Sequence, residues 1–144
     1  MCLSYNDALT QELRNKFQEN PGKPLTFYKY YIKEKSFLSC FHQYSMYTSS
    51  GIIKSNRIKV ELSSQEKDYY EVYTGIHVFL NRKDARRQLE GVIFLDYGDM
   101  ALVKITAYEK DLVGAGYFNG NESAVFMKVE ISKVSWRNLF KKKN

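Results

Sequence analysis

The stretch TGIHVFLNRKDARRQ, residues 74–88, contains the sharpest change of local pattern in this chain. The run IHVFL is apolar except for one histidine, so it predicts a short strand. Gly75, which precedes it, permits a tight turn into this strand. Asn81 then supplies a helix N-cap, and Asp84 stands three residues later, which is the spacing of a capping box. We therefore expect a strand that runs directly into a short helix ending at Gly91.

The predicted helix has one apolar side and one basic side. Ala85 and Leu89 would pack against the sheet, which leaves four cations facing water: Arg82, Lys83, Arg86 and Arg87. Arg82 and Lys83 fall at the positive end of the helix dipole, which disfavours each by roughly a few tenths of a kcal/mol. We interpret this misplacement as a hint of an anion site. The alternative is a purely solvated helix face, because exposed faces are often basic.

Patterns along the whole chain predict one further helix and many short strands. Residues 6–18 place Leu9, Leu13 and Phe17 at helical spacing, and the alternating, aromatic run at 25–33 (LTFYKYYIK) predicts a central strand. The other expected strands are 57–62, 70–73, 76–80, 92–96, 101–108, 117–118 and 124–131. We predict an α+β fold with a mainly antiparallel, mixed sheet of about five to seven short strands and two or three helices.

Three other segments give local expectations. Residues 36–50 (SFLSCFHQYSMYTSS) combine helical spacing with many serines, so we expect a short helix or an ordered loop. The C-terminal SWRNLF predicts a helical turn that docks Trp136, Leu139 and Phe140. The run GAGYFNG at 114–120 superficially matches a glycine-rich phosphate loop, but its spacing predicts a β-turn.

Composition predicts one globular domain with an excess of positive charge. The 144-residue chain has a formal net charge of +6 and contains twelve Tyr and nine Phe. We expect a single domain at 1–140 followed by a basic tail at 141–144. No apolar run is long enough to cross a membrane and no signal peptide is visible, so we expect a cytoplasmic protein without a membrane partner. The positive charge suits an acidic partner, nucleic acid above all.

Two residues are candidates for catalysis, and each also has a structural interpretation. His77 has no Ser, Cys or carboxylate at the spacing of a nucleophile and base, so we interpret it as a hydrogen-bonded structural histidine. The alternative is catalysis with a Tyr partner in the manner of ADP-ribosyl transfer. Cys2 would become the N-terminal residue on removal of Met1, as in N-terminal-nucleophile hydrolases, but the following Leu-Ser-Tyr lacks the glycine of glutamine amidotransferases.

The cysteine pattern predicts neither a metal site nor a cross-link. Cys2 and Cys40 stand far apart and form no CxxC or Cys/His ligand spacing. We expect both thiols to be reduced, and we predict no metal and no cofactor.

Several of these motifs together resemble a group of small proteins of unknown function encoded by tailed phages, prophages and some of their bacterial hosts. The matching positions are Met1–Leu3, Tyr28 and Lys29, Gly75–Phe79, Asp84 and Ala85, Gly116, and Val125–Ile131. They cover about half of the chain, and the segments at 6–18 and 36–50 depart from the pattern. The resemblance implies a compact α+β fold, a mobile-element origin and, for a phage gene, a place in the host cytoplasm. It implies no activity.

The aromatic strand supplies a second candidate for binding. Tyr28, Tyr30 and Tyr31, with Lys29 and Lys33 interleaved, could form a stacking platform for single-stranded nucleic acid or a nucleotide, although core packing gives the same pattern. Because no pair of reactive groups is visible, we expect a non-enzymatic binding protein, either an inhibitor of a host or defence component or a binder of nucleic acid or a nucleotide. The expected binding residues are Arg82, Lys83, Arg86, Arg87, Tyr28 and Tyr30. The alternative is a small enzyme that uses His77 or Cys2.

Overall fold

The structure, a computed structural model, describes residues 3–33, 38–40, 47–48, 50–55, 60–62, 70–72, 75–90 and 100–140. The strands of these residues are β1 (Leu3–Tyr5), β2 (Leu25–Lys33), β3 (Leu38–Cys40), β4 (Tyr47–Thr48), β5 (Ile52–Lys54), β6 (Val60–Leu62), β7 (Tyr70–Val72), β8 (Ile76–Phe79), β9 (Met100–Ala107), β10 (Leu112–Phe118), β11 (Asn121–Phe126) and β12 (Lys128–Glu130). The helices are α1 (Asp7–Glu19), α2 (Arg82–Glu90) and α3 (Lys133–Leu139), with a short 3-10 helix η1 (Glu109–Asp111).

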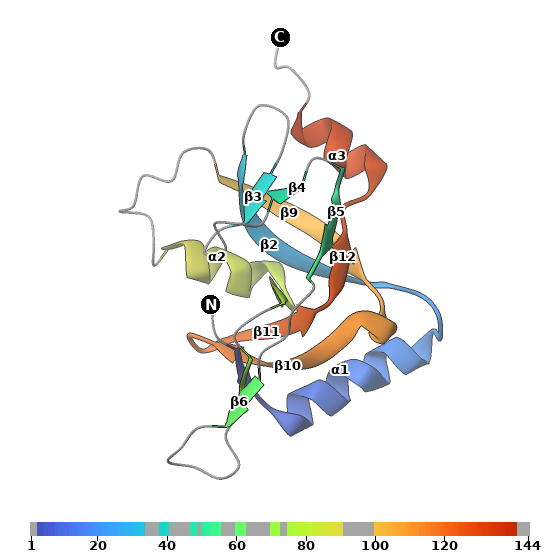
Figure 1. Cartoon of the computed structure of the whole chain (residues 1–144), viewed down its shortest axis with the longest axis vertical. Coiled ribbons are helices and arrows are strands. Elements are labelled where there is room, and N and C mark those ends of the chain that lie inside the picture. The colour runs from blue at the N-terminus through green and yellow to red at the C-terminus, as the bar shows by residue number, and fades with distance from the viewer. Residues whose placement is uncertain are drawn as a thin grey trace.

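The described strands form one antiparallel sheet (Figure 1). Their order is β5-β12-β9-β2-β8-β11-β10-β1-β7-β6, and β3 pairs with β2 and β4 beside this path. The expected α+β class, its single domain and its three helices are confirmed, and β2 lies near the centre of the sheet as predicted. The expected number of strands is wrong, because the described residues contain twelve.

The additional strands are short and depend on partners that are distant in sequence. β3 and β4 lie in the segment 36–50, so the expected helix is wrong for the described part of that segment. β5 has no counterpart in the sequence prediction, and it pairs with β12 far along the chain. The expected strand at 124–131 is divided at Met127, whose backbone N–H donates to the Asp111 carbonyl oxygen at 2.7 Å. The expected strand at 92–96 lies outside the described residues.

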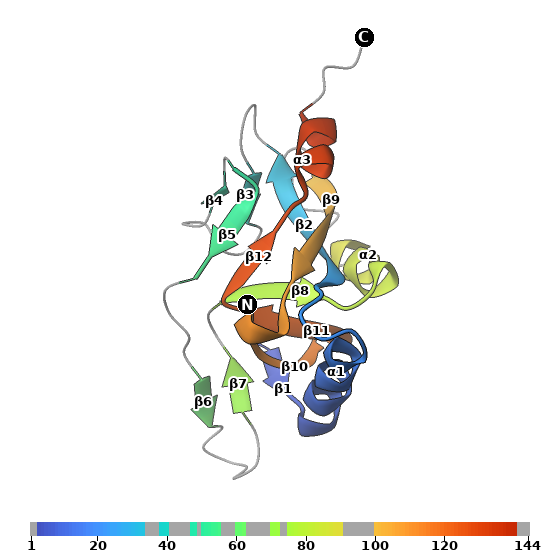
Figure 2. The same cartoon turned by 90° about the vertical axis from the view of Figure 1, so that its right-hand side faces the viewer.

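The sheet divides into two groups of strands at the β2–β8 junction. In the described part of the chain, Tyr28 and Phe79 are the one residue pair that joins these strands. Figure 2 shows β2, β9 and β12 crossing β8 and β11 at a steep angle. Between the two groups lies the core, in which Phe27 and Phe126 have ring centroids 4.9 Å apart and Phe17 of α1 packs against both rings.

Helix α1 has Asn6 as its N-cap and covers β10. The side-chain oxygen of Asn6 accepts a hydrogen bond from the Leu9 N–H at 2.8 Å. Leu9, Leu13 and Phe17 are buried as predicted. Thr10 completes the buried side, because its hydroxyl accepts from the Ala115 N–H at 2.9 Å. The helix is therefore attached to the sheet by a polar contact within an apolar interface.

The C-terminal half confirms two local predictions. The run at 114–120 forms a hairpin between β10 and β11, whose turn residues Asn119 and Gly120 have φ of 49° and 78°. Positive φ at both positions is typical of a two-residue hairpin turn. Trp136 and Phe140, whose ring centroids are 4.7 Å apart, pack with α3 against the core.

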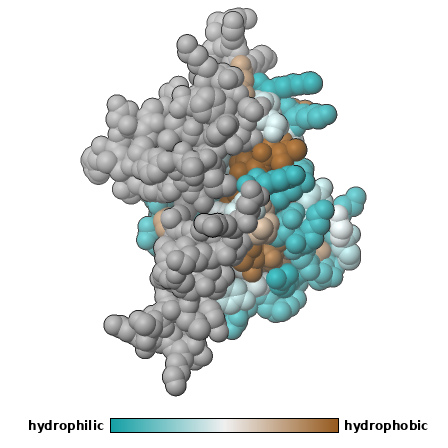
Figure 3. Space-filling model, viewed as in Figure 1, coloured by the Kyte–Doolittle hydropathy of each residue, from teal (hydrophilic) through white to brown (hydrophobic). Residues whose placement is uncertain are grey.

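The surface of the described residues is mostly hydrophilic on the face shown in Figure 3, with small hydrophobic areas between polar side chains. No helix in the described ranges is long and apolar enough to cross a membrane.

Candidate functional site

Helix α2 is held on the sheet by the predicted pair Asn81 and Asp84, although the return bond comes from the Asn81 side chain and not from its backbone N–H as in a capping box. The Asn81 Oδ1 accepts from the Asp84 N–H at 2.8 Å, and the Asn81 Nδ2 donates to the Asp84 Oδ2 at 3.0 Å. The same Asp84 Oδ2 accepts from the Glu122 N–H of β11 at 3.1 Å. The cap therefore serves both to start α2 and to fix its N-terminal turn to the sheet.

The inner side of α2 is buried and its outer side is basic. Ala85 and Asp84 are buried against the sheet, whereas the side chain of Leu89 lies outside the described residues. The four cations predicted to face water, Arg82, Lys83, Arg86 and Arg87, are all exposed. The structure thus presents them on one helix, but they have different neighbours.

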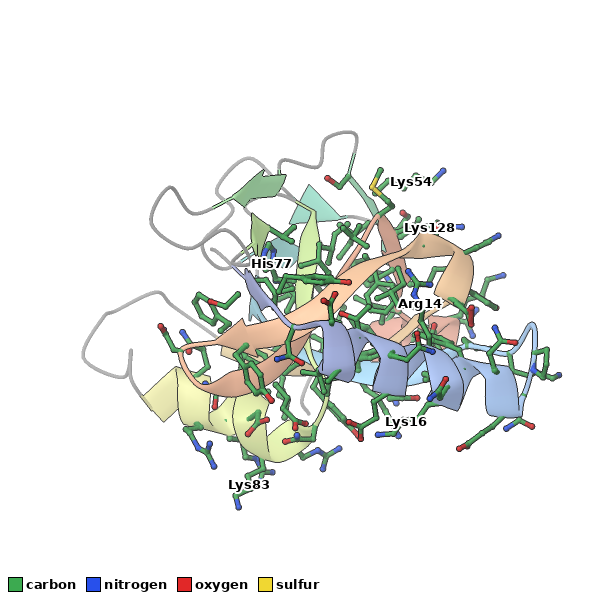
Figure 4. The ribbon with its side chains drawn as sticks, turned by 90° about the horizontal axis from the view of Figure 1, so that it is seen from below. Arg14, Lys16, Lys54, His77, Lys83 and Lys128 are labelled. Atoms are coloured by element: carbon green, nitrogen blue, oxygen red, sulfur yellow. The ribbon has the colours of Figure 1, made fainter. Side chains whose placement is uncertain are left out.

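Arg82 and Arg87 lie on opposite flanks of α2. The guanidinium carbon of Arg82 is 5.4 Å from the ring centroid of Tyr28 on β2, which is a cation–π distance. The Nη1 of Arg87 lies 3.6 Å from the Asp84 Oδ1 and 3.5 Å from the Asn121 Oδ1. Arg86, one helical turn after Arg82, belongs to the β2 flank. Figure 4 shows Lys83 pointing away from the sheet.

Tyr28 and Tyr30 share the face of β2 that lies beside this flank. They alternate with the buried residues Phe27, Lys29 and Tyr31, and both are half-buried. Across the β2–β9 ladder, Tyr28 is opposite Lys104, whose side chain is exposed, and Tyr30 is opposite Leu102. We call Tyr28, Tyr30, Arg82, Arg86 and Lys104 the α2–β2 surface.

Lys104 is a member of this surface that the sequence pattern does not predict. Nothing in the local pattern of β9 distinguishes it from another exposed lysine, because its neighbours come from the pairing register. Register information linking β2 to β9 would have identified it.

Two residues of the expected stacking platform on β2, Tyr31 and Lys29, point away from it. Tyr31 is buried and lies on the core side of β2, since consecutive residues of a strand face opposite sides. Lys29 is also buried, and its ammonium donates to the His77 carbonyl oxygen at 2.7 Å. Neither side chain contributes to the α2–β2 surface, and the side chain of Lys33 lies outside the described residues.

His77 is enclosed in the sheet with both ring nitrogens near backbone carbonyls. Its Nε2 is 3.1 Å from the Val72 oxygen and its Nδ1 is 3.4 Å from the Gly75 oxygen. A neutral imidazole has one N–H, and we assign it to Nε2 because this nitrogen makes the shorter contact. Burial, and next the nearby Lys29 ammonium, lower the pKa of His77 from 6.5 to about 4. The side chain is 2% exposed, which suits a structural group better than one that takes a proton from a substrate.

The other predicted chemical residues are only partly placed. Cys2 and the side chain of Cys40 lie outside the described residues, so their predicted reduced state stays a prediction. Within the described ranges, no group of three or more His, Cys, Asp or Glu side chains could hold a metal ion.

Comparison with protein-family models, with curated proteins and with solved structures finds no match to this chain. A function for the α2–β2 surface must therefore be argued from its own geometry.

Proposed function

We propose that this protein is a non-enzymatic binding protein whose α2–β2 surface holds single-stranded nucleic acid. The observation that carries the proposal is the position of the Arg82 guanidinium, 5.4 Å from the Tyr28 ring centroid, beside Tyr30 and across the ladder from Lys104. Proteins that bind single strands combine aromatic rings, on which bases stack, with cations that follow the phosphates. The α2–β2 surface has both kinds of group.

The cations flank the tyrosines on two sides. Arg82 and Arg86 approach from α2, and Lys104 approaches from β9, a neighbouring strand that lies about 4.8 Å from β2 in an antiparallel ladder. In the described part of the chain, Arg86 and Lys104 have no ion pair or hydrogen bond from their side chains. Both charges are therefore available to phosphates.

The chemistry of the surface favours binding over catalysis. Its side chains are two phenols, two guanidinium groups and one ammonium, with no thiol, imidazole or carboxylate among them. His77, the histidine of the catalytic alternative, is buried in the sheet. Catalysis by Cys2 stays open as an alternative, because that residue is outside the described ranges.

The resemblance to phage and prophage proteins supports a mobile-element origin as part of the same proposal. An acidic host or defence protein would compete for the same positive charges. Between the two, we favour nucleic acid, because half-buried tyrosines beside an arginine offer planar surfaces that bases use.

Fluorescence anisotropy with labelled single-stranded DNA and RNA oligonucleotides tests this proposal. We expect Arg86→Glu and Lys104→Glu each to weaken binding about tenfold. Each variant should also reduce the slope of log K against the logarithm of the salt concentration by roughly 0.7 per lost phosphate contact. Lys16→Glu, an exposed position on α1, is the control because it changes the net charge equally. It should change the affinity about twofold or less.

Two results would overturn the proposal. The first is no binding of either oligonucleotide at about 50 mM salt, which would instead favour an acidic protein partner. The second is an equal loss of affinity in Lys16→Glu, which would mean that net charge alone attracts the oligonucleotide.

A further inference from the structure

A groove unrelated to the α2–β2 surface lies beside the C-terminal half of α1. It has a volume of about 740 Å³, and its walls are the last turns of α1, the turn at 21–23 and the segment from Tyr108 to Leu112. This size is within the usual range of small-molecule sites, roughly 300–1,000 Å³. No residue of the α2–β2 surface lines it. We call it the η1 groove.

The η1 groove carries positive charge that its own carboxylate does not neutralise. Arg14, Lys23 and Lys110 line it, and Glu109 is its one acidic lining residue. Both Glu109 carboxylate oxygens lie 2.7 Å from the Gln18 Nε2, which donates to them. In the described part of the chain, none of the three cations forms an ion pair or a side-chain hydrogen bond. The groove is therefore suited to an anion.

The groove also has apolar and aromatic walls. Phe17 and Leu112 are buried lining residues, so they form the inner part of the groove. Tyr108 is half-buried, and the Lys110 Nζ lies 5.7 Å from its ring centroid. A planar group placed against Tyr108 would contact an aromatic ring with a cation close by.

The convergence of the three cations is not explained by α1 alone. The dipole of α1 favours basic residues in its last turn, where Lys16 lies. This effect does not explain why cations gather at the groove, because Lys16 is not one of the residues that line it. Figure 4 shows Arg14 on the side of α1 near the β9–β10 connection and Lys16 on the opposite side. Lys23 and Lys110 reach the groove from the following turn and from η1, which are separate segments. Three segments thus bring cations to one hollow.

We infer that the η1 groove binds a nucleoside phosphate. Its phosphates would pair with Arg14, Lys23 and Lys110, and its base would lie against Tyr108 over the apolar inner wall. This ligand class combines an anion with a planar ring, which are the two features that the groove accommodates. The inference is independent of nucleic-acid binding at the α2–β2 surface, because the two sites share no residue.

Isothermal titration calorimetry with ADP, pyrophosphate and adenosine tests the inference on the full chain. We expect ADP to bind about tenfold more tightly than either fragment, because each fragment uses only one part of the groove. Arg14→Gln and Lys23→Gln should each weaken ADP binding about tenfold, and Lys16→Gln, the matched control, about twofold or less. Tyr108→Leu should remove most of the preference for ADP over pyrophosphate.

The same titrations contain the results that would overturn the inference. These are the absence of ADP binding at about millimolar concentration, pyrophosphate binding as tightly as ADP, or Lys16→Gln matching Arg14→Gln. Loss of ADP binding in Lys104→Glu would place the ligand on the α2–β2 surface and would also overturn it. Because Lys23 lies in an exposed turn, its variant keeps the test valid if Arg14→Gln is poorly folded.

Discussion

Mild acid should destabilise the folded protein through His77. The pKa of His77 is lowered to about 4 in the folded chain, against 6.5 for a histidine in an unfolded chain. The unfolded chain therefore binds a proton in the interval between these values, while the folded chain does not. The contribution of His77 to the free energy of unfolding is fully present above about pH 6.5 and is lost as the pH falls toward about 4. Below about pH 4 this contribution changes no further. The full loss is about 3 kcal/mol.

The expected loss between about pH 7 and about pH 5 is about 2 kcal/mol, since most of the unfolded chains are protonated at the lower pH. Urea unfolding, followed by the fluorescence of the single tryptophan, Trp136, measures this loss at a series of pH values. The pH series ends at about pH 5 because carboxylates titrate below it.

His77→Gln separates this histidine from other titrating groups. The glutamine amide can still donate to the Val72 carbonyl oxygen, but it does not bind a proton, so the free energy of unfolding should become nearly flat across the interval. His42→Gln, which removes the chain's other histidine, should retain the slope. The reasoning is refuted if the wild-type protein shows no loss, or if His77→Gln keeps the wild-type slope.

Three other predictions concern local structure. Gly116→Ala should lower the free energy of unfolding by about 2 kcal/mol or more in urea titrations, because the added methyl group would meet the Ser4 carbonyl oxygen of β1; an unchanged midpoint would contradict the β1–β10 pairing. Arg87→Glu should cost roughly 1 kcal/mol in the same assay because it places a carboxylate beside Asp84, whereas Arg86→Glu should change stability by less than about 0.5 kcal/mol. Equal effects of the two variants would contradict the assigned flanks. Intact-mass measurement under native conditions should show both cysteines reduced, and a mass lower by two protons would refute this.

Local signals predicted the elements whose residues specify their own conformation. The Asn81 cap, the alternation in 25–33 and the apolar spacing of α1 each act over a few residues, and the structure has α2, β2 and α1 at these positions. Strands such as β5 depend on partners supplied by distant segments, so their own residues carry little signal. The strand count was therefore underestimated.

The candidate site was likewise predictable only where local signals determine the structure. The exposed cations of α2 followed from helical periodicity, which assigns each residue to a side of the helix. The contact of Arg82 with Tyr28 and the position of Lys104 depend on how α2 and β9 are placed against β2, which a single sequence does not specify. The η1 groove likewise joins segments separated by most of the chain.

Thr10 and Ala115 share hydrogen bonds although 105 residues separate them along the chain. A ribosome that adds about 5–20 residues per second takes roughly 5–20 s to make that interval. Throughout this time α1 has been synthesised, but β10, against which it packs, has not. During synthesis the apolar side of α1 lacks β10, and Phe17 lacks one of its two aromatic neighbours, Phe126, although Phe27 is already present. Completion of this end of the fold therefore waits for nearly the whole chain, and the nascent protein exposes an amphipathic helix that chaperones can bind.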